Sequence, residues 1–295
     1  MKPIPPSSND ARSPNSDQGR LFGHFAMNTQ FAIRFYRTER DPSDLLSVAQ
    51  ACFQEIDRLE NLFSRYREDS EISQINQLQP RQSLIVNHDT YQIVKIAFEL
   101  EQKSEGFFNI TLGHYTDPKK LIPIPLLPSS EPTFSLHPTR PIIYCLKRGG
   151  SLDLGAIGKG YALDRCGELL LSLGVHTALL SAGNSTYLAL GENPWEIVLQ
   201  GSANYQKVAL QKEALSASGT AIQGSHIINP HKPRHQPYFT ENLWVKAKTA
   251  TYADASSTLC MIASQTLIAT LKVQKRYFTE IYIEDSPHKN LVRWH

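Results

Sequence analysis

The sequence has no excess of charge of either sign. Its 30 lysine and arginine residues stand against 28 aspartate and glutamate residues, so the formal net charge at pH 7 is +2. Proteins that bind nucleic acids through the phosphate backbone present a broad basic surface. The balance of charge therefore argues against a nucleic-acid partner.

Cysteine is also scarce, and its spacing matches no metal or redox motif. The four cysteines, Cys52, Cys145, Cys166 and Cys260, lie far apart, and no two of them form a CxxC pair. Most of them fall within apolar segments that are typical of a protein core. This pattern indicates a protein from a reducing compartment.

Long apolar runs are missing as well. No stretch approaches the roughly 20 apolar residues of a membrane span, and the N-terminus lacks both a lipobox and the apolar core of about 7–15 residues of a secretory signal. We therefore expect a cytoplasmic protein without stable membrane insertion. Residues 1–20 are rich in Pro, Ser, Asn and Asp. Such a segment cannot repay the entropy of ordering, which predicts a disordered tail.

The 295 residues do contain 41% hydrophobic residues, enough for a large core. Within residues 43–63, apolar side chains recur at alternating steps of three and four, which predicts a long amphipathic helix. A second helix is predicted at residues 89–103. Residues 28–38 alternate like a strand, and the polar segment 63–77 is predicted to be a loop that leads to a short helix.

Prolines are dense between residues 117 and 140. Each proline lacks a backbone N–H and disfavours the helical conformation of the residue before it. We predict an extended loop at about 117–140, lying between two lobes of a single domain formed by residues 21–295.

The second half of the chain alternates short apolar runs with turn residues. We predict helices at residues 160–173 and at about 253–273. Strands are predicted in the segments "PIIYCL", "GSLDL", "HTALLSA", "TYLALG", "WEIVLQ", "YQKVALQ" and "FTEIYIE". This order of elements favours an α+β fold over a regular βαβ array.

The segment "DLGAIGKGYALD", residues 153–164, carries a glycine-rich turn into a helix. A Walker A loop would need glycine in place of Asp153 and a hydroxyl residue in place of Gly160, and a dinucleotide fingerprint would need glycine in place of Leu163. Two interpretations remain open. The turn presents a helix N-terminus and Lys159 to a phosphate, or it is an ordinary turn with a solvated lysine.

The segment "TYADASSTLCMIA", residues 251–263, offers a set of hard oxygen ligands. Asp254 and Thr258 are four residues apart, so they share one face of a helix, and Ser257 lies beside them. Carboxylate and hydroxyl oxygens suit Mg²⁺. The alternative is that Asp254 serves only as part of a helix cap.

The segment "SHIINPHKP" contains a candidate general base. Histidine titrates near neutral pH, so His226 is suited to accept a proton from a substrate. The alternative is a structural or exposed role, which most of the ten histidines must have. "LLSAGNSTY" and "ALSASGT" are interpreted as small-residue turns that either present N–H groups to a ligand or close hairpins.

Taken in order, the segments of this chain resemble one known family. They are "MNT", "FSRYREDSEISQIN", "GFFNIT", "LDLGAIGKGYALD", "SAGN", "SASGT", "HIINP" and "ADASST". Their combination, from about residue 22 to the C-terminus, is similar to the FAD:protein FMN transferases, or ApbE-like family. The resemblance implies a two-lobed α+β flavinyltransferase fold with FAD in the cleft between the lobes.

The resemblance also implies an activity. Members use Mg²⁺ to transfer the FMN moiety of FAD to a threonine or serine hydroxyl of an acceptor flavoprotein, and they release AMP. Asp254, Thr258, Ser257 and the backbone carbonyl of Ala156 would then bind Mg²⁺, and His226 would be the base toward the acceptor hydroxyl. The residues implied to contact FAD are Met27, Tyr66, Phe107, Phe108, Asn109, Asp153, Lys159 and Ile228.

The sequence departs from the family pattern at several positions. Asn109 and Asn229 stand where aspartate is common, and Asn184 and Ser185 stand where glycine and aspartate are common. These departures leave two alternatives to transfer. One is a protein that binds or delivers FAD without transferring FMN, and the other is hydrolysis of FAD to FMN and AMP.

Overall fold

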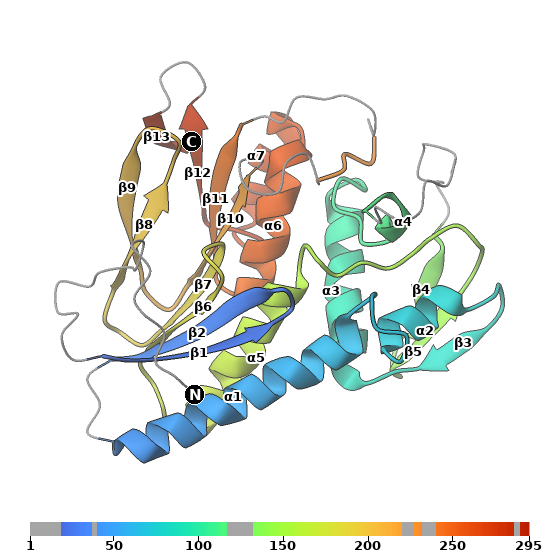
Figure 1. Cartoon of the computed structure of the whole chain (residues 1–295). Coiled ribbons are helices and arrows are strands. Elements are labelled where there is room, and N and C mark those ends of the chain that lie inside the picture. The colour runs from blue at the N-terminus through green and yellow to red at the C-terminus, as the bar shows by residue number, and fades with distance from the viewer. Residues whose placement is uncertain are drawn as a thin grey trace.

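The computed structural model describes residues 19–36, 40–116, 132–219, 227–231, 240–285 and 290–294. Its largest element is an eight-stranded sheet with the order β1, β2, β6, β7, β10, β11, β12, β13, and all neighbours in it are antiparallel (Figure 1). The strands are β1 (Arg20–Ala26), β2 (Thr29–Phe35), β6 (Ala178–Ala182), β7 (Thr186–Leu190), β10 (Ala214–Gly219), β11 (Asn242–Ala247), β12 (Glu280–Asp285) and β13 (Asn290–Trp294).

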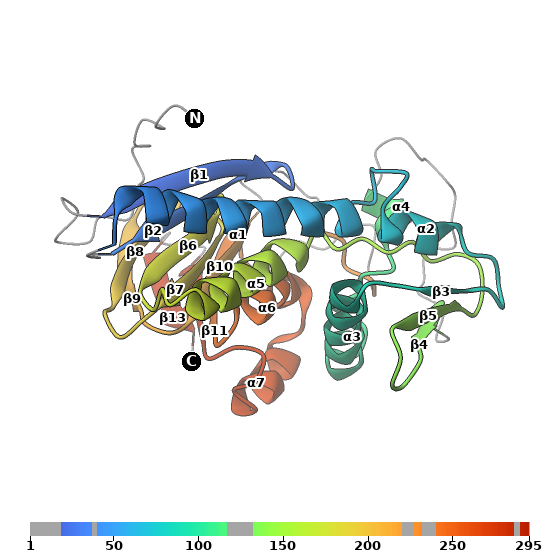
Figure 2. The ribbon, with the colours of Figure 1, turned by 90° about the horizontal axis from the view of Figure 1, so that it is seen from below.

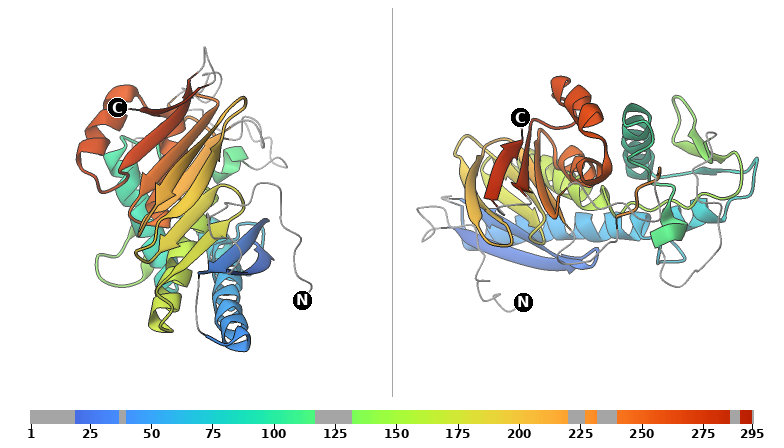
Figure 3. Two further views of the ribbon diagram at one scale, coloured as in Figure 1. Left: turned by 90° about the vertical axis from the view of Figure 1, so that its left-hand side faces the viewer. Right: turned by 90° about the horizontal axis from the view of Figure 1, so that it is seen from above.

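One face of this sheet is covered by helices α1 (Pro42–Phe63), α5 (Gly158–Ser172) and α6 (Ala250–Ile262), which lie side by side (Figures 2 and 3). Helix α7 (Gln265–Val273) follows α6. Helix α1 begins where Asp41 accepts a hydrogen bond from the Ser43 N–H, and proline follows the cap at the first helical position. Its apolar face, predicted from the sequence periodicity, is buried in the main core.

The opposite face of the sheet packs against a hairpin of β8 (Trp195–Gln200) and β9 (Tyr205–Leu210). Successive residues of each strand point to opposite faces. Leu180 of β6 therefore joins the main core under the helices, whereas Leu179 joins a second cluster with Trp195 and Trp244. Both faces of the sheet are thus buried in its central part.

A smaller group of elements lies at the C-terminal end of α1 (Figure 1). It comprises α2 (Glu71–Gln77), α3 (His88–Lys103), α4 (Gly113–Thr116) and a three-stranded sheet of β3 (Ser83–Ile85), β5 (Ile142–Cys145) and β4 (Phe134–Leu136), in that order. Antiparallel sheets with segregated helices confirm the α+β class that the element order predicted.

Three details of the predicted secondary structure are wrong. The helix predicted at 253–273 is two helices, because Ser264 caps a new one by accepting from the Leu267 N–H. "GSLDL" is not a strand and forms only an isolated bridge between Leu112 and Ser151. Residues Ala214–Gly219 of "ALSASGT" form strand β10 rather than a turn. Residues 1–18 of the predicted N-terminal tail lie outside the described residues, and β1 begins at Arg20.

The segment 117–140, predicted as an extended loop, contains a strand. Residues 117–131 lie outside the described residues, but β4 occupies Phe134–Leu136 and pairs with β5. His137 then orders the turn between these strands, because its Nδ1 accepts from the N–H groups of Thr139 and Arg140. The C-terminal part of the segment therefore belongs to the small sheet.

The four cysteines are free and buried, as their apolar surroundings predicted. In the described part of the chain, no helix has both the length and the apolar composition needed to cross a membrane.

Candidate functional site

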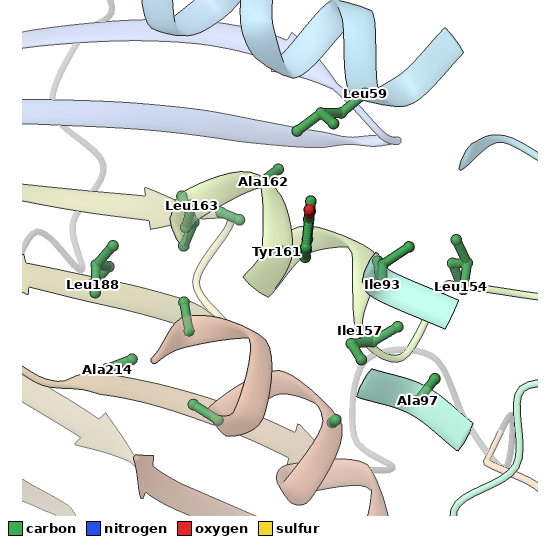
Figure 4. Close-up of a cluster of buried hydrophobic side chains, with 14 of the residues drawn as sticks. Leu59, Ile93, Ala97, Leu154, Ile157, Tyr161, Ala162, Leu163, Leu188 and Ala214 are labelled. Atoms are coloured by element: carbon green, nitrogen blue, oxygen red, sulfur yellow. The ribbon is translucent and has the colours of Figure 1, made fainter. Parts of the chain in front are cut away.

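The loop before α5 is anchored by its apolar residues. Leu154 and Ile157 are buried in the main core, in the same cluster as Ile93 of α3 (Figure 4). Between and after these anchors, Gly155 is exposed, and Ala156 and Lys159 are partly exposed. The alternation of anchored and exposed residues turns one side of the loop outward.

Asp254 of α6 is the centre of the contacts around this loop. It is only 4% exposed. Its Oδ2 accepts a hydrogen bond of 3.0 Å from the Gly160 N–H, and its Oδ1 lies 3.5 Å from the Lys159 Nζ. A buried carboxylate is tolerated when it is paired and hydrogen-bonded, and these donors supply both conditions.

Hydroxyl groups from the sheet complete the surroundings of Asp254. The Oγ1 of Thr186 and the Oγ of Ser216 each donate to Asp254 Oδ1 at 3.4 Å, and the two hydroxyls are 3.1 Å apart. Thr186 and Ser216 are both fully buried. The sequence analysis missed them, because only the pairing of β7 with β10 beneath α6 brings them to the carboxylate.

Ser257 and Thr258 differ in their surroundings. The Ser257 hydroxyl is 1% exposed, donates to the Asp254 carbonyl at 2.8 Å and lies 2.8 Å from the Ser218 hydroxyl. Thr258 is partly exposed and stands one helical turn after Asp254 on α6. Ser257 is therefore committed to contacts within the protein, whereas Thr258 is the more accessible of the two predicted ligands.

A divalent cation would find oxygen ligands here. Among the described residues, no group of three or more His, Cys, Asp or Glu could hold a metal ion. The predicted set has instead one carboxylate, from Asp254, with the Thr258 hydroxyl and the Ala156 carbonyl. This all-oxygen set fits Mg²⁺, which is usually bound through one or two carboxylates and completes its shell with water and substrate phosphates.

Gly160 has a structural role in the packing of two helices. A Cβ at Gly160 would lie 2.2 Å from the Ala250 carbonyl oxygen and 2.8 Å from the Asp254 Cβ. Gly160 is therefore required by the close packing of α5 against α6, which brings Lys159 to Asp254.

Asp153 and Tyr66 are linked through an arginine that the sequence analysis did not single out. Asp153 accepts from the Gly155 N–H at 2.9 Å and lies 3.4 Å from the Arg65 Nε. The Arg65 Nη2 donates to the Tyr66 hydroxyl at 2.9 Å. Tyr66 itself is 76% exposed. The structure thus joins two of the predicted FAD contacts into one surface next to the loop.

A second group joins the segment 227–231 to the turn after α3. The rings of Phe107 and His231 have centroids 4.4 Å apart, and His231 Nε2 donates to the Glu105 carbonyl at 3.0 Å. Ile228 is partly exposed in the same segment. The predicted FAD contacts Phe107 and Ile228 therefore belong to two segments that meet.

Phe108 is only 2% exposed and packs in the main core, so its side chain supports the turn from behind. Asn109 accepts from both the N–H and the hydroxyl of Thr111 at 2.7 Å. Asn229 accepts from the His231 N–H at 2.9 Å. Each amide oxygen thus serves a local turn.

Met27 lies at the tip of the β1–β2 hairpin. Its φ is 48° and that of Asn28 is 57°, both in the left-handed region. Two left-handed residues suit a tight hairpin, but a residue such as methionine adopts this conformation less readily than asparagine or glycine. His226, the predicted base, lies outside the described residues.

Comparison with known proteins gives these arrangements a family context. The model of the ApbE family matches residues 27–279 of the chain. A curated FAD:protein FMN transferase from Klebsiella pneumoniae is 28% identical over 166 residues, and the match spans about half of each protein, 52% of the chain and 52% of the relative. Another, from Vibrio cholerae, is 25% identical over 244 residues, which is 72% of the chain and 73% of the relative.

The fold has solved counterparts. A mutant form of the flavin transferase ApbE from Vibrio cholerae superposes with a TM-score of 0.79 at 18% sequence identity, covering 94% of the chain and 97% of that protein. The family model covers most of the chain, and the resemblance found in the sequence motifs is confirmed. The chain therefore belongs to the ApbE family.

Proposed function

We propose that the chain is a Mg²⁺-dependent flavinyltransferase that moves FMN from FAD to a threonine or serine hydroxyl of an acceptor flavoprotein and releases AMP. Support comes from the family, since its curated relatives are FAD:protein FMN transferases. The observation that carries the proposal is the approach of Lys159 and the Gly160 N–H to the buried carboxylate of Asp254. Taken separately, the motif of Lys159 could be an ordinary turn and Asp254 could be part of a helix cap. Their contact in the structure supports one shared site.

Asp254, Thr258 and the Ala156 carbonyl would hold Mg²⁺ in this reaction. When bound, the ion neutralises charge on the diphosphate of FAD and makes AMP a better leaving group. Lys159, which is partly exposed at the start of α5, supplies a second positive charge beside this position. Preorganised charges of this kind stabilise the negative charge that develops on phosphoryl oxygens.

The transfer itself exchanges the phosphoanhydride bond of the FAD diphosphate for a phosphoester bond to the acceptor hydroxyl. The acceptor hydroxyl oxygen attacks the phosphorus on the flavin side, the bond from that phosphorus to the oxygen bridging to AMP breaks, and AMP leaves with the electron pair. His226 takes the hydroxyl proton. Acid–base assistance of this kind contributes roughly 10²–10⁴-fold to a rate.

FAD would lie between the two groups of predicted contacts, in the cleft between the two lobes. Tyr66 and Asp153 form one group through Arg65, and Phe107 and Ile228 form the other. Met27 at its hairpin tip would flank the flavin ring. We place this activity in the cytoplasm, a reducing compartment that suits the four free cysteines.

Asn109 and Asn229, two of the departures that suggested a non-catalytic protein, both form hydrogen bonds in the structure. Asn109 and Asn229 each accept hydrogen bonds within their own turns, where an aspartate oxygen would serve equally. Asparagine keeps one acceptor of the carboxylate and its shape. The substitutions are therefore compatible with the turns that position Phe107 and Ile228, which favours transfer over simple FAD binding.

The test is to incubate the purified chain with FAD, Mg²⁺ and a candidate acceptor flavoprotein and then to look for flavin fluorescence in a denaturing gel. Matched samples contain EDTA, or an acceptor whose target threonine or serine is alanine. We expect fluorescence only in the complete reaction. Bound FAD without covalent transfer would support a storage or delivery role, and AMP formed without an acceptor would support hydrolysis.

A further inference from the structure

Asp164 of α5 is a partly buried carboxylate that the proposed reaction does not use. Its Oδ1 accepts from the Ala250 N–H at 2.7 Å. Its Oδ2 accepts from the Thr251 N–H at 2.8 Å and from the Thr251 hydroxyl at 2.5 Å. All of these donors belong to the first turn of α6, the helix that carries Asp254.

The remaining N–H groups of that turn are satisfied by Thr249. Its hydroxyl accepts from the Tyr252 N–H at 3.3 Å, and its carbonyl accepts from the Ala253 N–H at 3.0 Å. The first N–H groups of a helix have no partner within the helix and need one outside it. Asp164 therefore caps α6 from a neighbouring helix, in addition to the local cap.

The two helices cap each other. Helix α5 has no side-chain cap at Ile157, and its Gly160 N–H donates to Asp254 of α6. In return, Asp164 of α5 accepts from the first turn of α6. The missing side chain of Gly160 lets the two backbones approach, and the two carboxylates hold them at that distance.

The two helices that cap each other carry the predicted ligands of the proposed metal site. The Ala156 carbonyl and Lys159 lie on the α5 side, and Asp254 and Thr258 lie on the α6 side. Mg²⁺ requires a near-ideal octahedron with metal–oxygen distances of about 2.1 Å, so it tolerates little displacement of one helix along the other. A contact that sets the position of α6 on α5 therefore sets the spacing of the oxygen ligands.

We propose that Asp164 is a positioning residue of the metal site, which fixes the first turn of α6 against α5 and so sets the distance between the Ala156 carbonyl and the Asp254 carboxylate. The inference rests on the proposed function. It assigns Asp164 no contact with FAD or with the acceptor.

The experiment compares Asp164→Asn with Asp89→Asn. This substitution keeps the size of the side chain but leaves only one acceptor oxygen. Asp164 offers one oxygen to Ala250 and the other to Thr251, so one of these contacts is lost. Asp89 is the matched control, since it is a buried aspartate that is likewise bonded to a neighbouring helix, here α5 through the Tyr161 hydroxyl at 2.8 Å. The Asp89 carboxylate contacts Tyr161, Arg58 and Arg165, whereas the Asp164 carboxylate contacts the first turn of α6.

The primary readout is the affinity of each purified protein for Mn²⁺ as a probe of the Mg²⁺ position, measured by electron paramagnetic resonance in the absence of FAD. FAD affinity and thermal stability are measured in parallel. We expect Asp164→Asn to weaken Mn²⁺ binding at least about tenfold, whereas Asp89→Asn, at a similar loss of stability, leaves it within about twofold. The KM for Mg²⁺ should rise more than kcat falls.

Thr251→Val tests the same contact if Asp164→Asn does not fold, because it removes a single hydrogen bond at constant shape. It should weaken Mn²⁺ binding by several fold, and Thr251→Ser should restore it. The inference is overturned if these variants bind Mn²⁺ as tightly as wild type or lose no more affinity than Asp89→Asn. Failure of the wild type to bind Mn²⁺ would instead refute the metal site on which the proposed function depends.

Discussion

The Gly160 N–H of α5 donates a 3.0 Å hydrogen bond to the Asp254 carboxylate of α6, and Gly160 lies so close to α6 that no larger residue fits. The two motifs "DLGAIGKGYALD" and "ADASST" are almost 100 residues apart in the chain, but this contact makes them one site.

The first prediction concerns the space at Gly160. Gly160→Ala should lower the free energy of unfolding by at least about 1–3 kcal/mol, the usual cost of overpacking, because its Cβ would lie 2.2 Å from the Ala250 carbonyl oxygen. Gly158→Ala is the matched control, since its nearest neighbour is the Leu154 Cβ at 3.9 Å. Alanine in a helix should there be neutral or stabilising by up to about 1 kcal/mol. Urea unfolding of both variants measures the difference, and equal stability would contradict the packing account.

The second prediction concerns the positive charge at the start of α5. Lys159→Met should raise the KM for FAD about 10–100-fold, because a charge-assisted hydrogen bond contributes roughly 1.5–3 kcal/mol. Lys207→Met provides a control, since Lys207 pairs with Glu196 on the β8–β9 hairpin. Steady-state flavinylation at varied FAD measures both. A KM for FAD that is unchanged by Lys159→Met would argue against contact between this residue and the diphosphate.

A third prediction addresses the hydroxyls behind Asp254. Thr186→Val keeps the shape of the side chain but removes the donor that lies 3.4 Å from Asp254 Oδ1. We expect the affinity for Mn²⁺ to fall about 3–10-fold, as for the loss of one hydrogen bond of about 1 kcal/mol. Thr186→Ser restores the hydroxyl and should recover most of the affinity. If the valine and serine variants bind equally well, the hydroxyl does not orient the carboxylate.

The fourth prediction is a pH dependence of stability. Burial raises the pKa of Asp164 from 3.8 to about 6, although its hydrogen bonds from Thr251 and Ala250 act in the opposite direction. Between these two values the folded protein binds more protons than the unfolded chain. The contribution of Asp164 to stability is therefore complete below about pH 4 and is lost as the pH rises through about 6.

Asp164→Asn cannot titrate, so the difference in unfolding free energy between wild type and this variant should shrink by up to about 3 kcal/mol from pH 4 to pH 7. Urea unfolding across this pH range measures the difference at each pH. Parallel curves for the two proteins would show that Asp164 titrates at the same pH in both states.

Periodicity predicted the long helices well, because their burial follows from spacing within one segment. The bounds of α1 and α3 agree with the predicted ranges to one residue at each end. Strand β10 was mistaken for a turn, since "ALSASG" contains no β-branched or aromatic residue and is held by its neighbours β7 and β11. Its strand character comes from the sheet and not from its own composition.

In the candidate site, the sequence likewise predicted what depends on local spacing and missed what depends on long-range contacts. Motifs found Lys159 and Asp254, whose residue types and local spacing suit phosphate and Mg²⁺. Motifs could not predict the contacts of Thr186 and Ser216 with Asp254, or the contact of Asp164 with Thr251. These contacts join segments that are far apart in the sequence. Such contacts depend on the order of strands and on the crossing of α5 and α6.

The most direct measurement quantifies AMP and covalent flavin together, for the wild type and for His226→Ala, with FAD, Mg²⁺ and an acceptor flavoprotein. We predict equimolar AMP and flavinylated acceptor from the wild type. His226→Ala should keep its FAD affinity and lose at least about 100-fold in rate, as expected for a general base. Equal inactivity of both proteins, with FAD bound to each, would contradict FMN transfer and leave a flavin-binding protein.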